Sequence, residues 1–376
     1  MGFRGNVPRQ SLVGTSSPAQ ADPSPRRAMT LPAADRPSYK EGLAPFARPQ
    51  LSRSLLDLAT SILPVVVLVV VMDRLIDVSG WLTLALAPLL AGFLLRTFIV
   101  FHDCAHGNFL PTKRANHVLG AILGVVVFQP YQHWSHDHRV HHATAGDLDR
   151  RGVGDVPTLT VAEYDAKSPG GQLFYRLFRN PLIMFTIGPL VAMVILPRLV
   201  PKGARPRAKR SVLGTDLAIA AMIVALCVVM GPWHYLLVLG PAILLAGMAG
   251  VWLFYVQHQF EDAYWESGAT WDYADAALRG SSYLKLPKVL QFFSGNIGLH
   301  HVHHLSAKVP NYHLQAAHDA NPIFHEVPVL TIGDGMRATR LKLWDEDRGR
   351  LVGFADRHVA AEPAGGPSPT GATLPA

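Results

Sequence analysis

Five long apolar stretches constrain the fold of this chain more than any other feature of its sequence. They cover residues 55–72, 81–101, 181–199, 212–230 and 235–256. A helix needs about 20 apolar residues to cross a bilayer, and these stretches approach or reach that length. Only 16% of the residues are charged, well below the roughly 25% that is usual in soluble domains. The sequence therefore predicts an all-α integral membrane protein.

The two ends of the chain differ in composition from this apolar middle. Residues 1–45 are rich in Pro, Ser, Arg and Ala, a composition typical of disorder. Residues 351–376 end in a segment rich in Pro, Gly and Ala, and we expect a flexible tail there. A single membrane domain is then expected over residues 46–350.

Two connections between the apolar stretches are short, at residues 73–80 and 231–234. Each can form a tight turn, so the expected units are two transmembrane hairpins. Residues 198–210 carry six basic side chains, namely Arg198, Lys202, Arg205, Arg207, Lys209 and Arg210. Loops that are rich in Lys and Arg stay in the cytoplasm. We therefore expect both chain ends on the cytoplasmic side.

The parity of the crossings indicates which stretch does not span. Histidine clusters follow the stretches that end at residues 101 and 256, and one site can use both only if an even number of spans separates them. Three stretches lie between them, so the proline-containing residues 181–199 are assigned to a re-entrant or membrane-surface helix. The shorter stretch 118–128 is interpreted as an interfacial or buried helix. The prediction is four transmembrane helices in two hairpins, with a cytoplasmic helical cap that carries the site.

Eight of the 18 histidines fall into three tight clusters. The clusters are His102 with His106, then His138 with His141 and His142, then His300 with His303 and His304. Positions i, i+3 and i+4 of a helix share one face, so each cluster can turn its imidazoles toward one point. Neutral imidazole binds iron, zinc, copper and nickel. A chance occurrence on helix surfaces explains three such clusters poorly, and we expect a metal site.

The number of imidazoles favours two metal ions over one. A tetrahedral zinc ion is satisfied by three or four ligands, whereas two ions with several nitrogen ligands each would use all eight side chains. Asp103 and Asp137 lie beside the clusters and are candidates for the partners that orient imidazole N–H groups. For Asp103, a solvated charge at a helix end is the alternative.

The residues that follow the clusters resemble those of a known family. Residues 141–149 are HHATAGDLD, residues 305–313 are LSAKVPNYH, and residues 257–261 are QHQFE. Trp271-Asp272 and the sequence LRG at residues 278–280 follow in the same order. Over residues 50–345 the chain resembles the membrane fatty acid desaturases, most of all their acyl-lipid branch of the omega-6 (delta-12) type.

This resemblance implies a di-iron centre held by the eight clustered histidines. His258 matches a further ligand position that the desaturase superfamily uses shortly before the third cluster, and a structural histidine is the alternative. Asn296, four residues before His300, is a candidate for orienting a metal-bound water. A turn-forming asparagine is the alternative for that residue.

The same resemblance implies the reaction and its partners. An acyl chain, expected to be lipid-linked, gains a cis double bond at the expense of O2 and two electrons. A ferredoxin-type or cytochrome b5-type protein would supply the electrons on the cytoplasmic face. The basic loop 198–210 is a candidate dock for such a donor or, alternatively, a topology anchor beside anionic lipid. No nucleic-acid partner is expected, because the net charge of +7 falls on a chain that is only 16% charged.

Three other functions remain open at this point. Hydroxylases and ketolases of alkanes, sterols or carotenoids use a similar scaffold and add oxygen, where a desaturase removes two hydrogens. A metal transporter would need ionisable residues along its spans, and Arg96 is the main such residue here. A structural membrane protein with incidental histidines would lose no lipid unsaturation when His141 or His303 is replaced by alanine.

Overall fold

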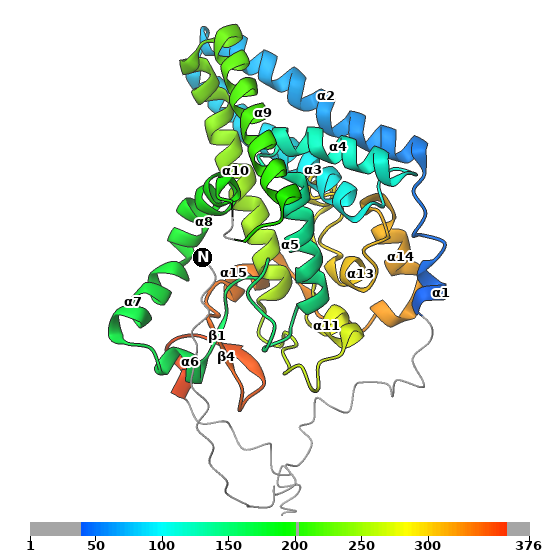
Figure 1. The fold of residues 1–376 in the computed structure, drawn as a ribbon, viewed down its shortest axis with the longest axis vertical. Helices are drawn as coiled ribbons and strands as arrows, with labels where there is room; N and C mark the ends of the chain where they lie inside the picture. The colour runs from blue at the N-terminus through cyan, green and yellow to red at the C-terminus, as the bar shows by residue number, and fades with distance from the viewer. Residues whose placement is uncertain (1–38, 201–202, 359–376) are drawn as a thin grey trace, which may run out of the picture.

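The computed structural model describes residues 39–200 and 203–358. The described chain is mainly helical, with long helices at one end and shorter helices and strands at the other (Figure 1). The long helices are α2 (Leu51–Ile76), α3 (Gly80–His106), α9 (Pro206–Met230) and α10 (Pro232–His258). Four of the five predicted apolar stretches lie within them and are confirmed as helices.

Shorter elements complete the described chain. The helices are α1 (Tyr39–Leu43), α4 (Lys113–Val126), α5 (Tyr131–Thr144), α6 (Val161–Asp165), α7 (Pro169–Phe178), α8 (Pro181–Pro189), α11 (Tyr273–Arg279), α12 (Lys288–Phe293), α13 (His300–Leu305), α14 (Leu314–Ala320) and α15 (Ile332–Ala338). The strands are β1 (Leu159–Thr160), β2 (Tyr283–Leu284), β3 (Val329–Leu330), β4 (Leu343–Asp345) and β5 (Arg350–Val352). β4 lies between β1, which is parallel to it, and β5, which is antiparallel, while β2 and β3 form a separate parallel pair.

Short turns join the long helices into the two expected hairpins. α3 begins after Ser79, whose hydroxyl accepts a hydrogen bond from the Leu82 N–H (3.5 Å) and so caps the helix. Between α9 and α10, Gly231 has a φ of 84°, a conformation that a β-carbon disfavours. Pro232 then starts α10 where its missing N–H costs nothing. Apolar side chains of α2, α3 and α10 pack into one core between the hairpins.

The stretch 181–199 forms a broken helix rather than a regular one. α8 passes at Pro189 into a π-helical turn (η2, Leu190–Ile195) and then a 3-10 turn (η3, Leu196–Arg198). Proline lacks an N–H and cannot continue the regular ladder, which accounts for the change at this point. By length and composition, residues Pro181–Arg198 are a fifth helix able to cross a membrane. The chain is thus a multi-pass membrane protein with five apolar candidate spans.

Secondary structure extends into both segments that the sequence predicts to be tails. α1 lies inside residues 1–45, for which the sequence predicts disorder, and residues 1–38 lie outside the described chain. Residues 351 and 352, placed in the flexible tail by composition, belong to β5. Leu351 and Val352 are buried there and pair with Trp344 and Leu343 of β4, so two apolar side chains fix the start of this tail.

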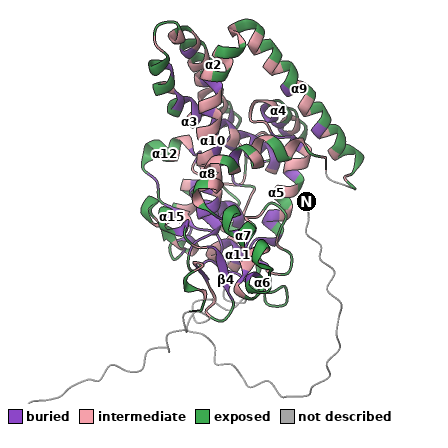
Figure 2. Cartoon of the chain, turned by 90° about the vertical axis from the view of Figure 1, so that its left-hand side faces the viewer, coloured by how far each residue is buried: buried purple, intermediate pink, exposed green. Residues whose placement is uncertain are grey.

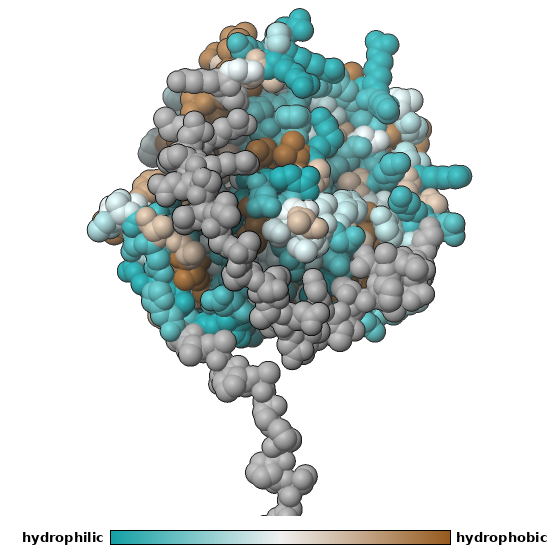
Figure 3. Space-filling model, turned by 60° about the horizontal axis from the view of Figure 1, so that its bottom comes forward, coloured by the Kyte–Doolittle hydropathy of each residue, from teal (hydrophilic) through white to brown (hydrophobic). Residues whose placement is uncertain are grey.

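Burial is concentrated where the membrane helices meet the shorter elements. Figure 2 shows exposed residues along the outer ends of α2 and α9 and buried residues where α10 enters the lower half. The largest hydrophobic core combines α3 and α10 with α11, α13 and α14. The opposite end of the molecule from the hairpin turns presents a mostly hydrophilic surface (Figure 3). The cluster-bearing helices therefore meet inside the protein, between an apolar end and a polar end.

Candidate metal centre

Nine histidine side chains from four helices meet in the interior of the described chain. They are the nine predicted metal ligands: His102, His106, His138, His141, His142, His258, His300, His303 and His304. α3 supplies its last turn, α10 supplies its last residue, and α5 and α13 supply residues at i, i+3 and i+4 spacing. The structure brings all nine together, including the isolated His258.

Left-handed residues set the ends of two of these helices. Gly107 has a φ of 71° and ends α3 directly after His106, as glycine commonly does after a helix. Gly295 and Asn296, with φ of 52° and 57°, turn the chain shortly before α13. Asparagine tolerates this conformation better than most residues. The Asn296 amide donates to the Asn311 carbonyl (3.1 Å) and touches none of the nine imidazoles by a hydrogen bond in the described chain.

The nine imidazoles separate into two groups. Group one is His102, His106, His138, His142 and His303, and group two is His141, His258, His300 and His304. Within each group, one ligand atom per residue lies within 4.8 Å of all the others. The Nε2 atom of His300 lies 2.9 Å from that of His258 and 3.1 Å from that of His304. In group one, the Nε2 atoms of His303 and His142 lie 2.9 Å apart.

The spacing of these nitrogens fits bound metal ions. With metal–nitrogen bonds of about 2.1 Å, two ligands at right angles lie about 3.0 Å apart, close to the distances above. Hydrogen bonds between the rings cannot account for this arrangement, because His300 Nε2 faces two other Nε2 atoms, whereas a neutral imidazole has a single N–H. His106 Nε2 is buried without a hydrogen-bond partner in the described chain. The donor set therefore suits two cations, one in each group.

Burial keeps these imidazoles in the neutral form that metals bind. It lowers the pKa of the group members outside the membrane helices well below the usual range, and neighbouring imidazoles lower each pKa further. These members are His138, His142, His300, His303 and His304. Desolvation disfavours the charged imidazolium, so at neutral pH each ring offers a lone pair.

In each group, a carboxylate outside the group holds one imidazole in position. In group one, Asp103 Oδ1 lies 3.2 Å from His102 Nδ1, and the other oxygen accepts the Asn311 N–H (2.7 Å). Asp103 thus lies where the sequence places it, beside the site. Asp137 does not: its carboxylate lies 3.6 Å from His133 Nδ1 and forms no hydrogen bond with the nine imidazoles in the described chain. Helical spacing explains this, because His133 and Asp137 are four residues apart.

Asp155, which sequence reasoning missed, takes the corresponding position in group two. Its Oδ1 lies 2.5 Å from His141 Nδ1, and its Oδ2 accepts the Gly152 N–H (3.1 Å). Gly154 lets this loop approach α5, since a β-carbon there would lie 3.0 Å from the Asp137 carbonyl oxygen and from His141 Cβ. The run Gly152-Val-Gly154 before an aspartate was the available signal, and it is a weak one.

We predict that Asp155→Ala weakens metal binding by group two while the fold is retained. Loss of a carboxylate that orients a metal-binding imidazole typically costs 10–100-fold in affinity, because the ring loses its fixed tautomer and orientation. The measurement is metal content per chain after dialysis against a graded chelator. Asp137→Ala is the matched control and should leave metal content unchanged; an equal loss in both variants would contradict the assignment.

A buried arginine fixes the end of α10 next to His258. Arg179 is fully buried and donates to Gln259 Oε1 (2.9 Å) and the Pro157 carbonyl (2.6 Å). Its guanidinium also donates to the Tyr255 hydroxyl (3.2 Å), one turn before His258. On the other side of the histidine, the Gln257 amide donates to the Ile297 carbonyl (2.8 Å). Both neighbours of His258 are thereby held in place.

Lys342 lies beside this arginine and makes stability depend on pH. Burial, and then the charge of Arg179, lowers the pKa of Lys342 to about 7. Between that value and the usual pKa of lysine, about 10.4, the unfolded chain binds one more proton than the folded chain. Stability contributed by this group should therefore rise from pH 7 to pH 10. Thermal unfolding at pH 7 and pH 9 should show a larger gain for the native chain than for Lys342→Met; equal gains would contradict it.

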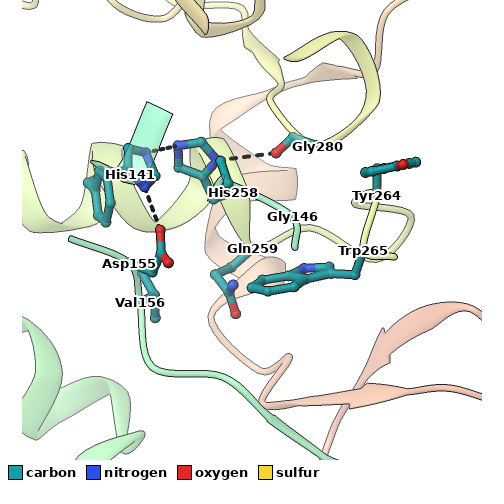
Figure 4. Close-up of a pocket in the computed structure, with 11 residues that line it drawn as sticks. His141, Gly146, Asp155, Val156, His258, Gln259, Tyr264, Trp265 and Gly280 are labelled. Atoms are coloured by element: carbon teal, nitrogen blue, oxygen red, sulfur yellow. Dashed lines mark hydrogen bonds and ion pairs between the residues drawn. The ribbon is translucent and has the colours of Figure 1, made fainter. Parts of the chain in front are cut away.

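One small hollow adjoins group two, and a second cavity lies among the membrane helices. The small hollow has both polar and apolar lining residues, which include His141, Asp155, His258, Gln259 and Trp265 (Figure 4). In this view the His258 Nδ1 points at the Gly280 carbonyl oxygen, 3.2 Å away, which leaves its Nε2 for the group. A larger apolar cavity lies among the membrane helices, lined by side chains of α3, the broken helix and α10.

Packed aromatic side chains lie between the apolar cavity and group one. Phe98 lines the cavity and lies 5.6 Å, centroid to centroid, from the Trp134 ring. The Trp134 ring stacks on His138 at 4.5 Å. A buried imidazole site in a multi-pass membrane protein, separated by two aromatic side chains from an apolar cavity between its helices, is the arrangement expected of a membrane enzyme that acts on a hydrocarbon.

Comparison with known proteins identifies the family. Residues 79–330 match the fatty acid desaturase family model. The chain is 48% identical over 318 residues to a fatty acid desaturase of Bacillus subtilis, covering 84% of this chain and 90% of the relative. It is 26% identical over 235 residues to the sn-1 oleoyl-lipid 12-desaturase of a Synechocystis species (59% and 63% coverage). It is 27% identical over 240 residues to that organism's sn-1 acyl-lipid omega-3 desaturase (ferredoxin), with 61% and 64% coverage.

The chain belongs to the fatty acid desaturase family. It is accordingly an oxidoreductase that desaturates fatty acids, as its sequence predicts. The hydroxylase or ketolase alternative is not favoured by any of these relatives, which are named as desaturases.

Proposed function

We propose that the chain introduces a cis double bond into a lipid-linked acyl chain, using O2 and two iron ions held by the nine imidazoles. The observation that carries this proposal is the two groups of facing Nε2 atoms, five side chains in one and four in the other. Bound iron would supply the oxidising power for an unactivated C–H bond, which no side chain can supply. The protein's own side chains position the acyl chain, keep water away and hold the imidazoles.

The apolar cavity supports an acyl substrate. Its lining is almost entirely hydrocarbon and includes Leu94 and Phe98 of α3, Pro189 and Met193 of the broken helix, and Gly247 and Gly250 of α10. Phe98 is four residues before His102, about 6 Å along the helix axis, and Trp134 fills the gap between them. An acyl tail in this cavity would present a methylene near group one, and a fixed tail position would fix the carbon that reacts.

Gly250→Leu tests this use of the cavity. A β-carbon at Gly250 would lie 3.8 Å from the Leu95 side chain, an ordinary contact, so a larger side chain fills the cavity without displacing backbone. We expect products shifted to shorter acyl chains, measured by gas chromatography of total fatty acids. Gly240→Leu, on the same helix and outside the cavity lining, is the control. An unchanged chain-length profile in Gly250→Leu would exclude this cavity as the tail site.

We propose that four helices span the membrane and that the site faces the cytoplasm. The two ends of the broken helix support this count. Near its start, the Phe185 ring packs on Tyr255, three residues before His258. At its end, Arg198 donates to the Phe128 carbonyl (2.8 Å), close before α5. The first contact is at the site-bearing end of α10, and the second is in the turn that leads into α5, so both ends of the broken helix meet elements that carry site histidines. The membrane domain is proposed over residues 46–350.

An external protein would provide the electrons. Three relatives of this family carry the word ferredoxin in their names. We propose a ferredoxin-type or cytochrome b5-type donor. Each turnover would take two electrons, two protons and one O2, remove two hydrogens from adjacent carbons, and release two waters.

Expression in a host without polyunsaturated lipids tests the proposal. With a ferredoxin and its reductase supplied, we expect acyl chains two mass units lighter, with a cis double bond by infrared or NMR spectroscopy, and two irons per purified chain. Products sixteen mass units heavier would instead support hydroxylation. An unchanged lipid profile with two irons bound would overturn the proposed reaction, and absence of iron would overturn the proposed cofactor.

A further inference from the structure

The helix α5 has two faces with different surroundings. Its inner face carries His138, His141 and His142 into the two groups. Its outer face exposes His136 and Arg139 to solvent. Figure 1 shows α5 at the front of the molecule, beside the lower end of α9 and leading down from the membrane helices toward α11. A molecule seated on the outer face would be one helix away from the imidazoles.

The lower end of α9 adds positive charge to this outer face. Ser211 Oγ accepts a hydrogen bond from the Gln132 N–H (3.1 Å), which joins α9 to the first turn of α5. Arg207 lies one turn earlier on the same side of α9 as Ser211. The exposed cations of this α5–α9 basic face are Arg139, Arg207 and Arg210, and in the described chain none of them forms an ion pair with an acidic side chain. Asp137, two residues before Arg139, pairs with His133.

The other helices that carry the groups are less accessible. All six residues of α13 are buried, and so are the last residues of α10, from Tyr255 to His258. The last turn of α3 is buried up to Ala105. α5 differs, because its outer surface is exposed to solvent. A helix with its side chains is about 10–12 Å across, and this width separates the outer surface from the imidazoles. Electron transfer weakens steeply with distance, so this face offers a short route from solvent to both groups.

We propose that the α5–α9 basic face docks an acidic one-electron carrier protein. This rests on the proposed function, in which two such carriers each deliver one electron per double bond formed. Charge complementarity is the argument for this partner, since electron-transfer encounters are small, transient and steered by opposite charge. Arg139 lies seven residues along α5 from Gln132, about 10 Å. This distance from the turn that meets α9 is about one Debye length. Salt therefore weakens attraction between Arg139 and charged lipids at the bilayer surface, whereas a soluble protein can contact Arg139 directly.

The test measures binding of a plant-type [2Fe–2S] ferredoxin to the full chain in nanodiscs of neutral phosphatidylcholine. The variant is Arg139→Glu with Arg207→Glu. The control is Lys285→Glu with Arg340→Glu, which makes the same charge change on exposed residues near α15, on the opposite side of the molecule from α5 in Figure 2. We expect Kd to rise at least about tenfold in the variant and its salt dependence to fall. The control should stay within twofold of the native chain.

Ferredoxin affinity equal to that of the native chain would overturn the proposal. If the variant instead lost binding only to anionic vesicles, the basic face would be a bilayer anchor, and the proposal would likewise fall. Desaturation driven by a small-molecule reductant should match the native chain in the variant, because no proposed ligand is changed. A native chain that forms no double bonds with any reductant would count against the proposed function, while the binding comparison would still decide the docking site.

Discussion

Replacement of His258 by alanine is expected to abolish desaturation and to lower iron from two ions per chain toward one. His258 is one of four imidazoles in group two, and its Nε2 faces those of both His141 (3.2 Å) and His300 (2.9 Å). Loss of an orienting partner already costs 10–100-fold in metal affinity, so loss of a ligand should cost at least about 100-fold. Iron is measured by mass spectrometry on the purified chain, and product by fatty-acid profiling.

His325→Ala is the matched control, because this exposed histidine belongs to neither group. It should keep both irons and full activity. A His258→Ala chain that also kept both would show that His258 is a structural residue. That result would leave group two with three imidazoles and undermine its assignment as a separate iron site.

Replacement of Asp57 by alanine is expected to destabilise the chain by about 3–5 kcal/mol, because a buried arginine would lose the only acidic partner that it has among the described residues. Asp57 on α2 pairs with Arg96 on α3, and both are buried. The second oxygen of Asp57 accepts from the Asn311 amide (2.8 Å), which also donates to Asp103 (3.0 Å). The ion pair thus supports the carboxylate that holds His102, and iron retention should fall as well.

The double variant Asp57→Ala with Arg96→Met separates the ion pair from simple loss of packing. Removal of both charges should recover a large part of the unfolding free energy, since the uncompensated charge is gone. The readout is chemical unfolding in detergent for the four chains of the cycle. A cost below about 1 kcal/mol for Asp57→Ala would mean that water reaches the pair, as it does for exposed ion pairs.

Local periodicity made much of this structure predictable from sequence. The lengths of the apolar stretches predict the long helices. The i, i+3, i+4 spacing predicts that the histidines of each cluster lie on one side of a helix. The division into two groups was not predictable. His138, His141 and His142 share one cluster, yet His141 joins His258 rather than its neighbours. That choice depends on where α10 and α13 lie relative to α5, which no local pattern encodes.

The contacts that support the site were harder to predict for the same reason. Asp137 is adjacent to His138 in sequence, but the helix turns its carboxylate to His133. Asp155 is fourteen residues from His141, and only the loop through Gly154 brings them together. Residues 181–199 have the composition of a span, and the break at Pro189 shows only in the backbone. His258 was found through family resemblance, because an isolated histidine has no pattern.

α5 and α13 each contribute to both groups, and this has a thermodynamic consequence. On α13, His303 belongs to group one while His300 and His304 belong to group two. Proposed ligands of different ions are thus one or three residues apart on one rigid helix, about 1.5–4.5 Å along its axis. A cation that orders either helix also orders part of the other binding site and lowers the entropy cost of filling it. Uptake of the two ions should therefore be cooperative, with half-filled chains scarce at intermediate metal supply.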